Sequence, residues 1–153
     1  MKTLIVYYSR TQTTKRIAEM IQKELDCDIE EITDGNKYNG KLGFMKGGMN
    51  ATMGRASDID PITKNPSDYD LVIIGTPVWS SNMVPAIHTY LLKYNDQIKN
   101  MASFCTCMGG GYDKALDKIA EVSGKTQLST MFLTSKEIEN PQEKIKTFIT
   151  KIE

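Results

Sequence analysis

Residues 4–14 read LIVYYSRTQTT, and this stretch decides the fold. Its first five residues are apolar and rich in β-branched and aromatic side chains, which is typical of a strand buried on both faces. A polar loop follows over residues 9–14. Apolar side chains then recur at helical spacing, and they predict a helix over 13–25: Ile17, Met20, Ile21 and Leu25. A doubly buried strand that runs directly into a helix indicates a parallel α/β sheet.

The same alternation continues along the chain. Further strands are predicted at 27–32, 69–75, 101–107 and 128–133, and further helices at 41–53, 85–92 and 115–120 and in a last segment that begins with Asn140-Pro141-Gln142-Glu143. The residue types of that segment are those of a capping box. Residues 76–83 and 108–111 are predicted to be loops. Because strands separated by helices cannot form hairpins, the order implies one parallel sheet with helices on both faces, in a single domain over 1–153.

The composition excludes several classes of function. The chain has 153 residues, 40% hydrophobic and 25% charged, and its 19 basic and 19 acidic residues balance. This neutrality argues against nucleic acid as a partner, because phosphate backbones require basic patches. Apolar runs of about five residues are far short of the roughly 20 that a membrane span requires. Three cysteines and no visible signal peptide favour a cytoplasmic protein.

Ligands of open parallel sheets bind at the carboxyl ends of the strands, which directs attention to three loops. The first is residues 9–14, in which five of six side chains carry a hydroxyl or an amide. It leads into a helix N-terminus, whose free N–H groups and positive dipole favour an anion such as a phosphate. The alternative is a polar turn in which Thr13 or Thr14 only caps the helix.

The other two loops contribute aromatic rings and glycines. Residues 76–82 contain Trp79, the only tryptophan, which if exposed would need a functional reason and otherwise packs on a neighbouring loop. Residues 109–111 are three glycines, followed by Tyr112, and they permit either close backbone approach to a ligand or a flexible turn. Together the three loops suit a flat aromatic cofactor with a phosphate tail.

Three segments resemble the flavodoxin-like family: residues 4–14, 73–79 and 107–112. The resemblance covers the whole chain. It implies an α/β three-layer sandwich with a five-stranded parallel sheet in the order 2-1-3-4-5, and non-covalent binding of flavin mononucleotide (FMN). One position departs from the pattern, since the family's phosphate loop commonly has glycine where this chain has Gln12, which implies weaker binding.

The resemblance also implies a set of cofactor-binding residues. Trp79 and Tyr112 would flank the isoalloxazine ring, and the backbone of 77–80 and 109–111 would reach its pyrimidine edge and N5. The full set is Ser9, Arg10, Thr11, Gln12, Thr13, Thr14, Thr76, Pro77, Val78, Trp79, Ser80, Gly109, Gly110, Gly111 and Tyr112. The flavin would carry the chemistry, with no catalytic side chain and no metal.

Three functions follow from this interpretation. The first is a flavodoxin-type carrier of electrons between redox partner proteins; the second is an FMN-dependent NAD(P)H oxidoreductase acting on quinones or similar acceptors. The third is a flavin-binding regulatory domain without turnover. Carrier flavodoxins are typically acidic, so zero net charge weakens the first interpretation unless a local patch serves instead, formed by Asp58, Asp60, Asp68 and Asp70.

Other reactive side chains are predicted to be structural. Cys105 and Cys107 alternate onto one face of a strand and are expected to be small buried residues, although Cys107 ends its strand beside the glycines. His88 lies on the apolar face of its helix. Three methionines (45, 49 and 53) suggest a helix face packed on the sheet or an adaptable contact surface.

Overall fold

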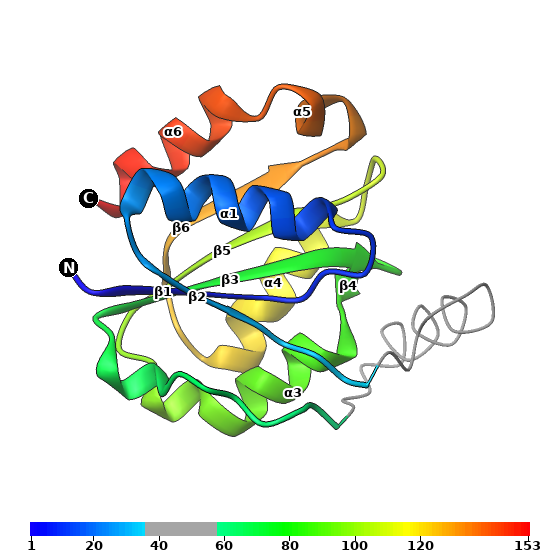
Figure 1. The fold of residues 1–153 in the computed structure, drawn as a ribbon. Coiled ribbons are helices and arrows are strands. Elements are labelled where there is room, and N and C mark those ends of the chain that lie inside the picture. Colours follow the sequence, from blue (N-terminus) through cyan, green and yellow to red (C-terminus); the bar gives the residue numbers. More distant parts are fainter. Residues whose placement is uncertain (36–57) are drawn as a thin grey trace.

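The computed structural model describes residues 1–35 and 58–153, and the helix predicted over 41–53 lies outside them. Figure 1 shows the chain alternating between strands and helices. The strands are β1 (Thr3–Tyr7), β2 (Asp28–Glu31), β3 (Leu71–Trp79), β4 (Asn82–Met83), β5 (Met101–Thr106) and β6 (Gln127–Leu133). The helices are α1 (Thr13–Leu25), α3 (Pro85–Tyr94), α4 (Tyr112–Ser123), α5 (Ser135–Glu139) and α6 (Gln142–Ile152), with 3-10 turns at Pro66–Asp68 and Asn95–Gln97.

The central sheet is parallel and has the order β2-β1-β3-β5-β6. Counted along this path, the order is the predicted 2-1-3-4-5, so the predicted fold class is confirmed. The order reverses beside β1, because β2 pairs on one side of it and β3 on the other. Such a reversal brings the loops after β1 and β3 to one place at the carboxyl edge.

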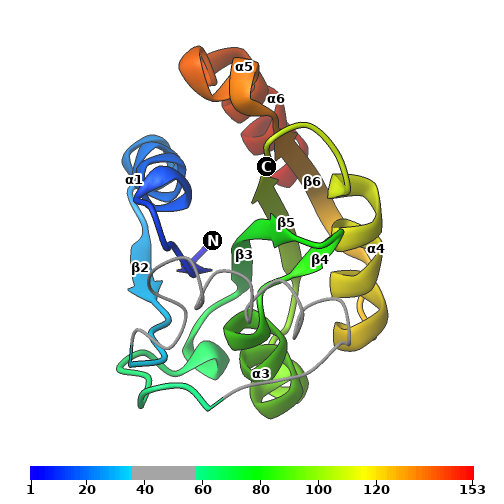
Figure 2. The ribbon, with the colours of Figure 1, turned by 90° about the vertical axis from the view of Figure 1, so that its right-hand side faces the viewer.

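Helices cover both faces of the sheet, as Figures 1 and 2 show. On one face, α1 and α6 bury the apolar stripes predicted from the sequence, including Ile17, Ile21 and Phe148. On the other face, α3 and α4 bury Ile87, Leu91 and Ile119, among others. Because β1, β3 and β5 are covered on both sides, their residues are wholly or almost wholly buried up to Thr76 and Thr106.

The predicted loop over 76–83 is wrong, because this segment is a β-hairpin. β3 runs on to Trp79 and pairs antiparallel with the short β4, with Val78 opposite Met83 and Trp79 opposite Asn82. Ser80 and Ser81 form the turn with φ of 49° and 59°. Two left-handed residues are what a type I′ hairpin turn requires, and that turn is normally recognised by Asn-Gly rather than Ser-Ser. The sequence therefore lacked the usual signal.

The predicted capping box at Asn140 is also wrong. α6 begins at Gln142, Pro141 occupies the N-cap position and no side chain caps it. The capping-box pair lies upstream, where the Glu137 carboxylate accepts the backbone N–H of Thr134 at 2.9 Å and opens α5. The end of α4 is as predicted, since Gly124 stops it with a φ of 66°. Within the described ranges, no helix has the length and apolarity needed to cross a bilayer.

Candidate functional site

A cavity of about 320 Å³ opens at the carboxyl ends of the strands. It lies where the topology predicts a ligand, between the loops that follow β1, β3 and β5 and the start of α5. The lining residues are Arg10, Thr11, Thr13, Thr14, Pro77, Val78, Trp79, Thr106, Cys107, Met108, Ser135 and Ile138. A second cavity of about 250 Å³, between β6 and α6, shares no residue with it.

The loop after β1 presents hydroxyls and a helix N-terminus to the cavity. Thr13 and Thr14 are the first two residues of α1, so neither is its N-cap, and the interpretation that they only cap the helix is wrong. Their amides belong to the first turn, whose N–H groups have no acceptor within the helix. Ser9 is half-exposed and does not line the cavity, and its Oγ accepts the backbone N–H of Lys15 in the first turn of α1 at 3.2 Å.

A buried pair of hydroxyls joins this loop to the centre of the sheet. Thr14 Oγ1 lies 2.9 Å from Thr106 Oγ1 at the end of β5, and both side chains are buried. This hydrogen bond fixes the start of α1 relative to β5. Sequence reasoning missed Thr106, although a polar residue at the end of a doubly buried strand is a signal that could have found it.

Gln12 occupies the N-cap of α1 in the left-handed region, with φ 70° and ψ −4°. A non-glycine residue in that region costs about 1–2 kcal/mol. The residue at this position is therefore strained, which explains physically why glycine suits this turn. Gln12 is exposed and its side chain does not cap the helix.

We expect Gln12→Gly to raise the free energy of unfolding by about 0.5 kcal/mol, because relief of the left-handed strain exceeds the chain entropy that glycine adds. Urea unfolding of the apoprotein measures it. Asp26→Gly is the matched control, since Asp26 is left-handed (φ 47°) at the other end of the same helix. Both changes should stabilise the fold, but only Gln12→Gly should alter FMN affinity. A loss of stability in Gln12→Gly would contradict the claim that the left-handed backbone of Gln12 is strained.

Trp79 forms part of the cavity wall and is almost completely buried, with 6% of its surface exposed. Its ring meets the Tyr8 ring edge to face, with centroids 5.7 Å apart and planes at 87°. The tryptophan therefore packs on a neighbouring segment and also borders the cavity. Thr76 is turned inward, because its hydroxyl donates to the Pro77 carbonyl at 2.8 Å and accepts the Val84 N–H at 3.2 Å.

The glycine loop, residues 109–111, contains glycines in two different environments. Gly111 has a φ of 81°, and a Cβ there would lie 2.8 Å from Ser81 Oγ and 2.9 Å from Ser81 Cα. Its lack of a side chain thus lets the loop lie against the hairpin turn, beside Ser80. Gly109 and Gly110 are exposed, and nothing lies within 4 Å of the position that a Cβ would take.

Tyr112 lies outside the cavity lining. Its ring is stacked on Phe132 of β6, with centroids 3.7 Å apart and an angle of 7° between the planes. Met108, which precedes the glycines, does line the cavity and is 90% exposed. The exposed apolar residue at the rim is therefore Met108.

The fourth side of the cavity comes from α5, which sequence reasoning did not predict. Ser135 and Ile138 line it. Ser135 Oγ donates to the Met108 carbonyl at 2.9 Å, and the Arg16 guanidinium donates to the Ile138 carbonyl at 3.1 Å. The available signal was the Thr134-x-x-Glu137 spacing, which is that of a capping box.

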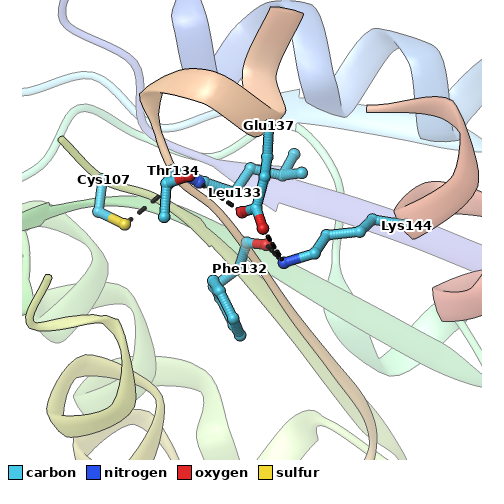
Figure 3. Close-up of polar contacts among 6 residues, drawn as sticks. All are labelled: Cys107, Phe132, Leu133, Thr134, Glu137 and Lys144. Atoms are coloured by element: carbon cyan, nitrogen blue, oxygen red, sulfur yellow. Dashed lines mark hydrogen bonds and ion pairs between the residues drawn. The ribbon is translucent and has the colours of Figure 1, made fainter. Parts of the chain in front are cut away.

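Few of the described residues that line the cavity are charged or ionisable. Arg10 contributes a permanent positive charge beside the hydroxyls of the loop. Burial raises the pKa of the Cys107 thiol, whose Sγ lies 3.7 Å from the Leu133 carbonyl (Figure 3). Burial also raises the pKa of Cys105 to about 12. Both cysteines are buried and free, and His88 is half-buried with a pKa lowered by burial and by Lys118.

The four aspartates proposed as a patch do not lie together. The Asp60 N–H donates to the Thr33 carbonyl just beyond β2, at the carboxyl edge of the sheet. The Asp70 N–H donates to the Lys2 carbonyl before β1, at the opposite edge. In the sequence, Asp58 is close to Asp60 and Asp68 is close to Asp70. The prediction of one acidic patch is therefore wrong.

These features match the chemistry of a phosphate joined to an aromatic ring. Arg10 and the threonines at the start of α1 line the cavity together with Trp79, Pro77 and Met108, which give it an apolar wall and rim. A helix N-terminus with hydroxyls binds phosphate without a basic excess, which agrees with the neutral composition. The donor set thus fits a flavin nucleotide.

The comparisons with known proteins agree with this geometry. A family model described as Flavodoxin matches residues 2–152. A flavoprotein from Lactobacillus acidophilus, solved in complex with FMN, is 25% identical, with a TM-score of 0.75 over 90% of this chain and 96% of that one. A Bacteroides uniformis protein provisionally described as a flavoprotein is 22% identical, with a TM-score of 0.77 over 97% of both chains.

A more distant likeness is to oxidised flavodoxin 1 from Bacillus cereus, which is 17% identical with a TM-score of 0.55 over 98% of both chains. No curated protein matches the sequence.

Proposed function

Because the chain belongs to the flavodoxin family, we propose that the cavity at its strand ends binds FMN and that the loaded protein carries electrons. The electrons would pass between redox partner proteins or to a small acceptor. When bound, FMN supplies the one- and two-electron chemistry. The protein's own contribution is to hold the cofactor, exclude water from part of it and leave an edge open.

The residues that would hold the cofactor fall into two groups, one suited to the phosphate and one to the flavin ring. Thr11, Thr13 and Thr14, with the first-turn amides of α1 and the charge of Arg10, are suited to the phosphate. Trp79 offers a ring that is already fixed by its contact with Tyr8, so ordering it on binding costs little entropy.

The observation that carries the proposal is how few acid–base groups occur among the described residues that line the cavity. Among the described residues that line it, Arg10 and Cys107 are the ones that ionise. The Arg10 guanidinium offers no site that accepts a proton, and burial raises the pKa of the Cys107 thiol, which disfavours the thiolate. Neither group is suited to exchange a proton near neutral pH, whereas simple electron transfer requires no such group. The exposed rim formed by Met108 and its neighbouring glycines leaves access for a partner.

A reductase is the second candidate, and a specific observation favours it. Electron carriers use a charged surface to steer their partners, but this chain is neutral, and the four aspartates considered as an acidic patch divide between opposite edges of the sheet. A small quinone-like acceptor requires no such surface.

Two measurements on the FMN-loaded protein separate these functions. The first is oxidation of NADH and NADPH with a quinone as acceptor. The second is photoreduction followed by visible absorption, which shows whether the flavin takes up electrons in two separate steps. We expect separate one-electron steps and negligible turnover, as a carrier requires.

Rapid turnover would overturn the carrier and establish the reductase. If neither turnover nor exchange of electrons with other redox proteins occurs, the flavin would have a regulatory role. Free FMN at the same concentration is the control for background reduction of the quinone.

A further inference from the structure

The α5 wall of the cavity is held by several polar contacts and by Ile138, which packs against the core. α5 has five residues and none of them is buried. A helix this short cannot maintain itself by its own hydrogen bonds, so its position depends on its neighbours. Towards the cavity it is bonded to Met108 and Arg16, as described above.

On its outer side α5 is tied to α6 by an ion pair. Glu137 Oε1 lies 2.8 Å from Lys144 Nζ, while Glu137 Oε2 accepts the Thr134 N–H. The pKa of Glu137 is lowered mainly by the hydrogen bond from Lys144, and the hydrogen bond from the Thr134 backbone is the next largest cause. Both side chains of the pair are about one-third exposed, at 35% and 34%, so the pair is partly shielded from water.

The same ammonium group also holds the edge of the sheet. Lys144 Nζ donates to the Phe132 carbonyl at 3.0 Å and lies 3.6 Å from the centroid of the Phe132 ring. Figure 3 shows dashed lines from Nζ to both the Glu137 carboxylate and this carbonyl. Tyr112 stacks on the same ring, and Tyr112 begins α4 directly after the glycine loop.

One amine is therefore connected to two walls of the cavity. Its ion pair with Glu137 leads to α5, and its position over the Phe132 ring leads through Tyr112 to the loop that contains Met108. Lys144 itself does not line that cavity. We propose that Lys144 is a positioning residue for FMN: it fixes α5 and the glycine loop in the arrangement that the cofactor requires. This inference rests on the proposed FMN site.

The test compares FMN affinity with the stability of the apoprotein. Lys144→Met keeps most of the side-chain length but removes the charge, and we expect it to weaken FMN binding about tenfold, the effect of losing one charged hydrogen-bonded contact. Lys144→Arg retains the charge and should restore affinity to within about threefold of the original. Affinity is measured by quenching of FMN fluorescence, at a temperature at which circular dichroism shows the apoprotein folded.

Lys118→Met is the matched control. Lys118 forms an ion pair of similar length, 3.1 Å, with Glu121 on α4, where neither residue lines the cavity. Its loss should leave FMN affinity unchanged. In Lys144→Met, amide exchange should accelerate over residues 134–139 and 109–112, a local change that general destabilisation would spread over the sheet.

Glu137→Gln tests one of the two connections separately. Because Glu137 and Lys144 act through the same bond, the double variant should bind FMN no more weakly than Lys144→Met alone. Affinity within about twofold of the original in a folded Lys144→Met protein would overturn the inference while leaving the site intact. An original chain that fails to bind FMN would overturn both, and that result requires no variant. If Lys144→Met does not fold, the same twofold limit on FMN affinity is applied to Glu137→Gln.

Discussion

Trp79→Ala should lower the free energy of unfolding of the apoprotein by about 3 kcal/mol, the lower end of the range for truncating a buried large aromatic side chain. The structure gives the reason: Trp79 is 6% exposed and its ring meets Tyr8 edge to face. Truncation removes this packing and leaves a void at the end of β3. Urea unfolding of the apoprotein measures the loss.

The same change should also weaken FMN binding. Stacking of a ring is typically worth about 0.5–1.5 kcal/mol beyond area burial, which corresponds to roughly twofold to twelvefold in the dissociation constant. Trp79→Phe is the control, because it keeps an aromatic wall and should retain most of the affinity. If affinity and fluorescence quenching were unchanged in Trp79→Ala, Trp79 would not contact the flavin, whereas unchanged stability would contradict the packing.

Gly111→Ala should destabilise the protein by about 2 kcal/mol, because two penalties add. The residue has a φ of 81°, which costs a non-glycine residue about 1–2 kcal/mol. Its new Cβ would also lie 2.9 Å from Ser81 Cα, an atom of the backbone that cannot rotate away. Either the loop or the hairpin must shift, so FMN affinity should fall as well. Thermal unfolding and FMN titration measure the two effects.

Two further variants make this prediction specific. Gly109→Ala is the matched control, since it adds the same methyl group to the same loop where nothing lies within 4 Å, and it should change stability by less than about 0.5 kcal/mol. Ser81→Gly in the Gly111→Ala background removes the serine side chain but leaves its backbone in the way of the new methyl group, so it should restore stability only in part. Equal losses in Gly109→Ala and Gly111→Ala would show that loop entropy, not close approach, governs this loop.

Much of the fold was predictable because burial leaves a clear pattern. The strand β1 and the first half of β3 are continuous apolar runs, β5 alternates, and α1 and α6 repeat apolar residues at helical spacing, so their type and order followed directly. The hairpin was not predictable, because its turn uses two serines in a conformation that normally selects asparagine and glycine. The short α5 lacks buried residues, and so it produced no apolar period.

The candidate site was likewise predictable only in part. Thr11, Thr13, Thr14 and Trp79 could be assigned to the cavity, since each lies on a loop that the topology places at the carboxyl edge. Ser135 and Ile138 could not, because their position depends on how α5 packs. Tyr112 was expected beside the flavin from its place in the chain, yet its ring lies on Phe132.

The sequence by itself determined the layered α/β fold, the edge of the sheet at which the cavity opens and the hydroxyl-rich loop that lines it. These follow from local periodicity and from the fixed handedness of crossovers, which depend on neighbours in the chain. Only the tertiary structure decided which rings face the cavity, that Gly111 accommodates Ser81, and that Lys144 connects two of its walls. Those interactions join residues distant in sequence, and side-chain packing rather than local preference selects among them.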